Sequence, residues 1–173
     1  MKQLTLLRHA HAAWPENRTR DFDRPLDDLG RKGLLVIAPS LARLVRTVDL
    51  VLLSPAARAV QSYDILAQHM NLPQPVRDPN LYMAGEDQLL DILHAQPDDV
   101  QHIFIIGHNP GLQYLLSLLL TAPSATPLAH HFPTSAYAQL ESAAPWAEWE
   151  KGDVKLRAHN WPQNIDPDIE ADR

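Results

Sequence analysis

Three short apolar runs separated by helical patterns constrain the fold of this chain most. The runs are QLTLLR (3–8), DLVLLS (49–54) and VQHIFIIG (100–107), and each has the length and composition of a strand buried on both faces. Segments with helical spacing of apolar residues follow at 27–48, 55–70, 86–96 and 111–120. This alternation predicts an α/β fold. We expect a three-layer sandwich, in which a mostly parallel central sheet carries helices on both faces.

Capping residues and prolines refine the expected boundaries of these segments. Asp27 has the side chain of a helix N-cap, and the apolar pattern after it continues to about Val48. Pro39 lies inside that helix and lacks an N–H group, so we expect it to kink or divide the helix. The helix at 55–70 begins with proline, which suits a first turn. A short strand is expected at 75–78, and two more polar, alternating strands near an edge of the sheet at 134–141 and 152–160.

Composition narrows the classes of protein. The chain has 173 residues, which suits one domain, expected at 1–160 with an acidic tail at 161–173. A net charge of −6 argues against a nucleic-acid or anionic-membrane surface, and the absence of cysteine excludes disulfides and thiolate zinc sites. The first residues lack the pattern of a signal peptide, and the apolar run at 114–120 is too short to span a bilayer. We therefore expect a cytoplasmic protein that binds neither nucleic acid nor membrane.

Unusual side chains follow three of the predicted strands. The first strand ends in Arg8-His9-Ala10-His11, the second in Ser54-Pro55 with Arg58 one helical turn later, and the third in Gly107-His108-Asn109-Pro110-Gly111. Each set alone is typical of a solvated loop, a turn or a helix surface. In a parallel sheet, however, the three sets meet at one edge, where ligands bind in open α/β folds. Two arginines and two histidines beside helix N-termini predict a local anion site in an acidic protein.

Four motifs, in this order, resemble those of a known family. They are LLRHAHA, DRPLDDLGRKG, LLSPAARAVQSYDIL and IIGHNPGL. Together they resemble the histidine phosphatase superfamily, in its phosphoglycerate mutase-like branch, and the short SixA-type phosphohistidine phosphatases within it. The resemblance extends from about residue 3 to residue 140. One departure is Ala10, where the family usually has glycine; it matters only if the backbone there needs a positive φ.

The resemblance implies a role for each strand-end residue. His9 would be the nucleophile and would carry the phosphoryl group as a phosphohistidine intermediate. Arg8, Arg58 and His108 would bind the phosphate oxygens and stabilise the transition state, and Asn109 would help to bind the substrate. The reaction would need no metal or other cofactor, because positioning and electrostatics supply the catalysis.

A metal site is the alternative interpretation of the histidines. His9 and His11 have the spacing of a metal-binding pair, and His108, His130 and His131 could join them. Two arginines aimed at the same place would repel a divalent cation, so we predict no metal. The other histidines, His69, His94, His102 and His159, are expected at the surface or at helix ends.

The predicted substrate depends on a missing acid. Relatives generally carry a glutamate after the third strand that protonates the leaving oxygen, but this chain has Met83 there. Glu86 and Asp87 are possible replacements, although both also suit the first turn of a helix. Only one helix and one strand fit between Tyr82 and His108, which predicts an open site that admits a phosphorylated protein side chain. We therefore expect a phosphatase acting on phosphohistidine in a protein. A broad phosphomonoesterase acting on small phosphate esters and a catalytically idle phosphate-binding module are the alternatives.

Overall fold

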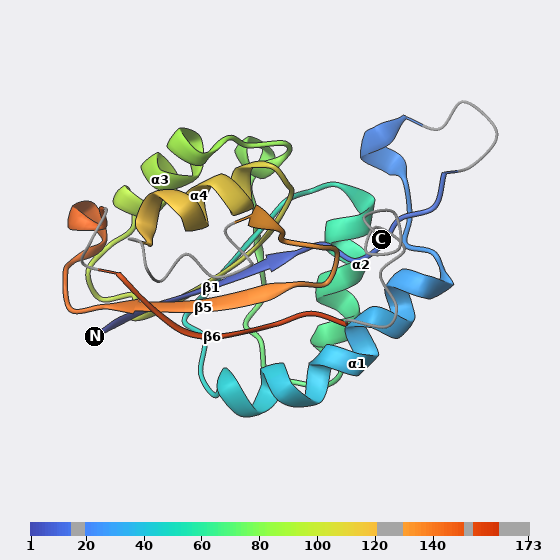
Figure 1. Ribbon diagram of the computed structural model, residues 1–173, viewed down its shortest axis with the longest axis horizontal. Helices are drawn as coiled ribbons and strands as arrows, with labels where there is room; N and C mark the ends of the chain where they lie inside the picture. The colour runs from blue at the N-terminus through green and yellow to red at the C-terminus, as the bar shows by residue number, and fades with distance from the viewer. Residues whose placement is uncertain (15–19, 121–129, 151–153, 163–173) are drawn as a thin grey trace.

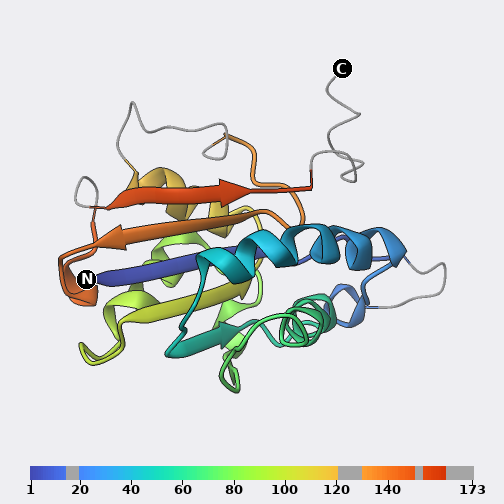
Figure 2. The same cartoon turned by 90° about the horizontal axis from the view of Figure 1, so that it is seen from below.

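A single mixed sheet runs through the centre of the molecule. The computed structural model describes residues 1–14, 20–120, 130–150 and 154–162. Within these residues the sheet has six strands in the order β3-β2-β4-β1-β5-β6, which Figure 2 shows from below. The first four are parallel: β1 (Lys2–Arg8), β2 (Leu50–Leu53), β3 (Val76–Arg77) and β4 (His102–Gly107). Of the last two strands, β5 (Tyr137–Ser142) pairs antiparallel with β1, and β6 (Lys155–Asn160) pairs antiparallel with β5.

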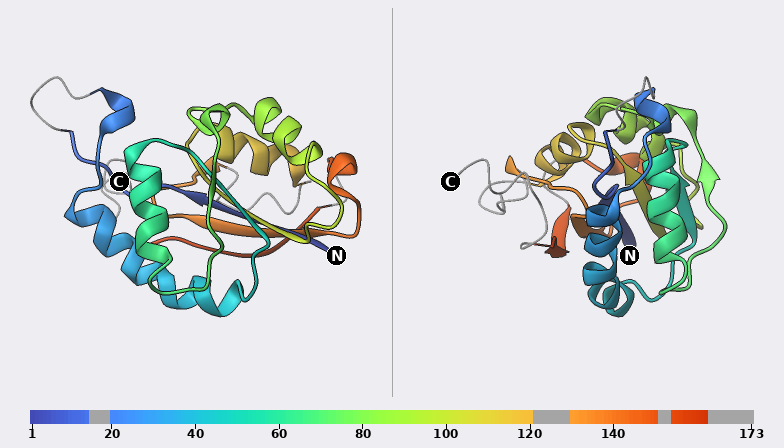
Figure 3. Two further views of the ribbon diagram at one scale, coloured as in Figure 1. Left: turned by 180° about the vertical axis from the view of Figure 1, so that it is seen from behind. Right: turned by 90° about the vertical axis from the view of Figure 1, so that its right-hand side faces the viewer.

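Helices cover both faces of this sheet, as the alternation of segments predicts. Helices α3 (Glu86–His94) and α4 (Gly111–Leu119) lie on one face, and α1 (Asp28–Leu44) and α2 (Ala57–Leu66) on the other (Figure 1). The two layers are also visible from behind and from the end of the molecule (Figure 3). The predicted three-layer α/β sandwich is therefore confirmed.

The side chains of β4 explain why its sequence is uniformly apolar. Ile103 and Ile105 belong to the core beneath α3 and α4, whereas Phe104 and Ile106 belong to the core beneath α1 and α2. All four side chains are fully buried. Full burial of a side chain of this size stabilises the fold by about 1.5–3 kcal/mol, so both layers are held to the sheet through this strand.

The start of α1 is fixed against the loop that follows β1. The Asp27 side chain caps the helix by accepting a hydrogen bond from the Gly30 amide at 2.8 Å, as its residue type predicts. A Cβ atom at Gly30 would lie 2.1 Å from the His11 carbonyl oxygen, so only glycine allows this approach. The helix thereby holds the chain just after His9 in place.

Of the two effects expected of Pro39 on α1, a kink or a division, the division does not occur. The helix continues through it to Leu44. Pro39 lies on the solvent side of the helix, as does Leu35, the residue one turn earlier whose carbonyl loses its helical hydrogen bond. Water can satisfy that carbonyl, so an uninterrupted helix is tolerated at this position.

The two late strands lie near an edge of the sheet, as expected: β6 is the edge strand on that side and β5 lies between β1 and β6. β5 is nevertheless buried along most of its length. The expectation for His102 needs correction, because its side chain is buried and not on the surface. Its ring bonds the Thr5 hydroxyl at 2.8 Å and the Thr47 carbonyl at 2.6 Å, and these partners make burial of a polar ring acceptable.

Some predictions concern residues that the structure does not describe. The acidic tail predicted at 161–173 lies outside the described residues except for Trp161 and Pro162. The division into one domain and a tail stays a prediction. None of the described helices is long and apolar enough to cross a membrane.

Candidate active site

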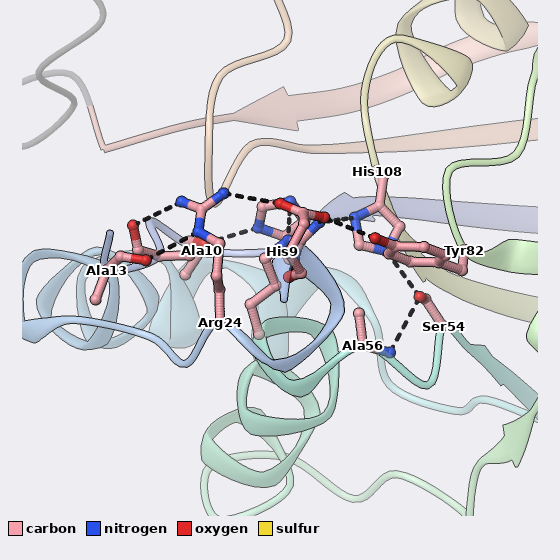
Figure 4. Close-up of polar contacts among 11 residues, drawn as sticks. His9, Ala10, Ala13, Arg24, Ser54, Ala56, Tyr82 and His108 are labelled. Carbon is pink, nitrogen blue, oxygen red and sulfur yellow. Dashed lines mark hydrogen bonds and ion pairs between the residues drawn. The ribbon is translucent and has the colours of Figure 1, made fainter. Parts of the chain in front are cut away.

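The three predicted strand ends meet at one edge of the sheet. β4 lies between β1 and β2, and the last residues of β1 and β4, Arg8 and Gly107, pair in register. The residues that follow these strands, His9, Ser54 and His108, are therefore neighbours in space (Figure 4). The rings of His9 and His108 have centroids 4.9 Å apart. The sequence pattern correctly predicts this convergence.

Hydrogen bonds determine the tautomer of His9. Arg58, in the first turn of α2, is buried, and its Nε donates to His9 Nε2 at 3.1 Å. Because a guanidinium only donates, Nε2 must carry the lone pair. The other ring nitrogen, Nδ1, lies 2.8 Å from the Ala10 carbonyl oxygen and must donate to it. His9 is therefore held as a neutral ring with a lone pair on Nε2, as a nucleophile requires.

The electrostatics of the site favour this neutral form. Burial lowers the pKa of His9 well below its ordinary value, and His108, Arg58 and Arg8 lower it further. The hydrogen bond to the Ala10 carbonyl acts in the opposite direction but does not outweigh them.

His108 is held in the complementary way. Its Nδ1 accepts from Arg58 Nη2 at 3.3 Å, so its Nε2 carries the proton and donates to the Ser54 hydroxyl at 2.7 Å. Burial, followed by the nearby Arg58, lowers the pKa of His108 to about 3. A phosphate dianion beside the ring would raise this pKa and favour the cationic form of His108, which is the stronger donor to a phosphate oxygen.

The remaining predicted residues, Arg8 and Asn109, contact the loop before β5. Arg8 Nη1 and Asn109 Nδ2 both donate to the Phe132 carbonyl, at 3.1 and 2.8 Å. Gly111 starts α4 so close to the Ala84 carbonyl oxygen that a Cβ atom would lie 1.8 Å from it. Glycine is therefore required to bring His108 and Asn109 to this edge.

These side chains border one cavity of about 380 Å³. All five predicted residues contribute to its wall: Arg8, His9, Arg58, His108 and Asn109. His11, Trp14, Asp21, Arg24, Met83 and Thr134 are further members of the wall. The cavity therefore contains three arginines, three histidines and one carboxylate, a composition suited to an anion.

Asp21 is the residue that the sequence prediction missed. It lies in the 3₁₀ turn Asp21–Asp23 and accepts from Arg58 twice, at its carbonyl (2.6 Å) and at Oδ2 (2.9 Å). Tyr82 donates to the same Oδ2 at 2.7 Å, and Arg24 donates to Oδ1 at 3.0 Å. The hydrogen bond from Tyr82, followed by those from Arg24 and Arg58, lowers the pKa of this carboxyl far below its usual range. The DRPL segment marks the region, but only the folded chain brings Asp21 to Arg58.

Three of the five histidines considered for the alternative metal site border the cavity: His9, His11 and His108. The ring of His11 bonds the Asp27 carboxylate, and His130 and His131 do not border the cavity. Within the described ranges, no group of three or more histidine, aspartate or glutamate side chains could hold a metal ion.

The candidate acids after Met83 also lie away from the cavity wall. Glu86 and Asp87 form the acidic first turn of α3, which is the structural role considered for them. Neither borders the cavity, whereas Met83 does and is 53% exposed. Ala10, by contrast, replaces the family's glycine without strain, because it does not adopt a positive φ.

Acidification is expected to destabilise the fold as the pH falls below about 6.5. His9, His102 and His108 have lowered pKa values in the folded chain, so the unfolded chain binds more protons below pH 6.5. The free energy of unfolding then falls with decreasing pH, by up to about 1.4 kcal/mol per pH unit for each ring. Urea unfolding at several pH values measures this slope. His108→Asn should make it shallower and a change at the exposed His69 should not; a free energy of unfolding independent of pH would contradict the account.

The fold and the site together define an α/β protein with a buried, neutral histidine in an arginine-rich pocket suited to an anion. A model of the histidine phosphatase superfamily (branch 1) matches residues 4–82. The uncharacterized Mycobacterium tuberculosis protein Rv1276c is 30% identical over 163 residues, which cover 91% of this chain and 100% of that one.

Solved structures of histidine phosphatases also resemble this chain. A candidate phosphohistidine phosphatase SixA from Agrobacterium tumefaciens is 30% identical, with a TM-score of 0.78 and coverage of 93% of this chain and 98% of that one. The protein histidine phosphatase SixA complexed with tungstate is 25% identical, with a TM-score of 0.77 and coverage of 94% and 99%. The chain belongs to the histidine phosphatase superfamily and is of the SixA type.

Proposed function

We propose that this protein removes the phosphoryl group from phosphohistidine in another protein, through a phosphohistidine intermediate on His9. The observation that supports this most strongly is the lone pair on His9 Nε2, set among Arg8, Arg58 and His108 at the wall of one cavity. The similar SixA structures named as phosphohistidine phosphatases support the substrate class, and tungstate in one of them is a tetrahedral oxyanion like phosphate.

The first step transfers the phosphoryl group to His9. A phosphate held by Arg8 and Arg58 replaces part of the hydrogen bonding of Arg58, including its bond to Nε2. The released lone pair attacks phosphorus while Nδ1 keeps its proton and its bond to the Ala10 carbonyl. His108 donates to an equatorial oxygen once the phosphate charge raises its pKa, and it stabilises the charge of the transition state. Water then attacks the phosphohistidine and releases inorganic phosphate.

The side chain of Met83 favours a leaving group that needs little help. Methionine has no proton to donate, and it stands on the cavity wall where relatives generally carry an acid. A protonated imidazole leaves as a neutral ring, and its ordinary pKa of about 6.5 lets water protonate it near neutral pH. An alkyl phosphate must expel an alkoxide, for which general acid catalysis is typically worth about 10²–10⁴-fold.

Met83→Glu is expected to raise the hydrolysis of alkyl phosphates by about 10²-fold or more and to change phosphohistidine hydrolysis little. The measurement is kcat/KM for a phosphohistidine peptide, an aryl phosphate and an alkyl phosphate, all in EDTA. The unmodified protein should prefer them in that order, and activity in EDTA supports the proposed independence from metal. Glu86→Gln and Asp87→Asn are the matched controls and should leave the order unchanged.

The same panel tests the alternatives. Efficient alkyl phosphate hydrolysis by the unmodified chain would favour a broad phosphomonoesterase, particularly if Glu86→Gln or Asp87→Asn removed it. Phosphate binding without turnover of any substrate would identify an idle binding module. Loss of activity in EDTA, restored by zinc or manganese, would contradict the metal-independent mechanism.

A further inference from the structure

A carboxylate stands inside a cavity that otherwise suits a phosphate. Asp21 occupies both terminal nitrogens of Arg58, whose Nε bonds the nucleophile His9. A phosphate dianion bound to Arg58 would meet this like charge at close range, where repulsion is strong. A positive group in the substrate would offset this repulsion, whereas a simple phosphate ester has no such group.

The position of Asp21 is built by its neighbours. Arg24 and Tyr82 lie on opposite sides of His9 in Figure 4, and both donate to the Asp21 carboxylate. Arg24 is held in turn by the Ala12 and Ala13 carbonyls, at 3.2 and 2.9 Å. The 3₁₀ turn is therefore tied to the loop after β1 and to the residue preceding Met83.

The carboxylate also keeps capacity for a ligand. Two carboxylate oxygens offer about four acceptor positions, and Arg58, Tyr82 and Arg24 fill three of them. Oδ1 has Arg24 as its hydrogen-bond donor, and the side chain of Asp21 is 44% exposed at the cavity. A donor arriving with the substrate can therefore bond Oδ1 without displacing a partner from the described part of the chain.

We infer that Asp21 determines specificity, because its carboxylate accepts a hydrogen bond from the ring N–H of a phosphohistidine substrate and favours the protonated imidazole. This inference rests on the proposed function and identifies what in the cavity selects a phosphorylated imidazole. The three donors to Asp21 hold its pKa low, so it acts as an ionised acceptor and not as a proton donor. It takes the place of an acid by stabilising a leaving group that already carries its proton.

The proposed step balances without proton transfer to or from Asp21. The lone pair of His9 Nε2 forms a bond to phosphorus, and the bond between phosphorus and the substrate ring nitrogen breaks. The electron pair of that bond stays on the ring nitrogen, while the other ring nitrogen keeps the proton that faces Asp21. The leaving group is thus a neutral imidazole, and the positive charge it carried remains on phosphorylated His9.

The test compares Asp21→Asn with Asp23→Asn, a change in the same 3₁₀ turn at a residue that does not border the cavity. Asp21→Asn should lower kcat/KM for a phosphohistidine peptide by about 10- to 100-fold, the size expected for a hydrogen bond to a charged group. Hydrolysis of p-nitrophenyl phosphate should be unchanged or faster, because this leaving group needs no proton and the repulsion has been removed. Phosphohistidine activity should fall as the pH rises and the substrate imidazole loses its proton. In Asp21→Asn this fall should begin at a lower pH than in the unmodified chain. Asp23→Asn should preserve both activities.

Two outcomes would overturn the inference. An equal loss on both substrates would mean that Asp21 only positions Arg58. A gain on both would mean that it merely competes with phosphate.

A binding experiment separates this inference from the proposed function. If the unmodified chain does not hydrolyse the phosphohistidine peptide, the proposed function fails, but Asp21 can still be tested in His9→Ala, which cannot turn over. Calorimetry then compares phosphoramidate, whose nitrogen carries a positive charge beside phosphorus, with orthophosphate. The inference predicts that adding Asp21→Asn weakens phosphoramidate relative to orthophosphate by about 10-fold or more. An unchanged ratio would overturn it whatever the outcome with the peptide.

Discussion

Replacing His9 with alanine is expected to lower kcat by on the order of 10⁴–10⁶-fold, as the loss of a nucleophile does in other enzymes that form covalent intermediates. The physical reason is that His108, whose ring lies beside that of His9, is engaged at both nitrogens: Arg58 bonds its Nδ1 and Ser54 bonds its Nε2. Phosphate binding should survive, because Arg8, Arg58 and His108 remain. Steady-state kinetics with the aryl phosphate and phosphate titration by calorimetry measure the two effects.

A matched control separates this effect from unfolding. His130 is exposed and does not border the cavity, so His130→Ala should keep full activity. Circular dichroism and urea unfolding should show that His9→Ala remains folded. Activity near that of the unmodified chain in a folded His9→Ala protein would show that another group is the nucleophile.

Replacing Arg58 with alanine is expected to lower kcat by about 10²–10³-fold, or roughly 3–4 kcal/mol of transition-state stabilisation. Arg58 contacts His9, His108 and Asp21 at once, so its loss removes a phosphate ligand and frees both rings. Vanadate or phosphate inhibition should weaken as well, since the guanidinium binds the anion in the ground state too.

The pH dependence of Arg58→Ala gives a second signature. Arg58 is one of the groups that lower the pKa of His9 and of His108, so both values should rise in the variant. A larger share of His9 is then protonated at mildly acidic pH, and the loss of activity should be greater at pH 6 than at pH 8. Arg58→Lys should restore the charge but not the multiple contacts. Arg31→Ala, at an exposed residue of α1, is the control. Unchanged vanadate affinity in Arg58→Ala would show that Arg58 does not bind the anion.

The predictable part of the site is the part encoded by strand ends. His9, Arg58 and His108 each follow a buried apolar run at a short fixed distance, and parallel strands bring such positions together whatever the details of the loops. Asn109 reaches the same wall because the turn between β4 and α4 is short and close-packed at Gly111. Local pattern and topology are sufficient for these residues.

Asp21 could not be predicted in this way. It lies in a polar loop whose sequence has several charges, and its partners Arg58 and Tyr82 are 37 and 61 residues away. Pairings over such distances depend on how a loop packs, which periodicity does not report. His102 illustrates the same limit, because its burial depends on Thr5 and on the Thr47 carbonyl from other segments. Pro39 is the converse case: local propensity disfavours proline inside a helix, but α1 continues through Pro39 because that position faces solvent.

The most direct test of the central claim is to trap the phosphoryl group on the protein. The chain is mixed with a radiolabelled phosphohistidine peptide, quenched in alkali within one turnover, and digested for mass spectrometry. We expect label on His9 that is stable in alkali and lost in acid, and no label in His9→Ala. Label on any other residue, or hydrolysis of the peptide without a labelled protein at any quench time, would contradict that claim.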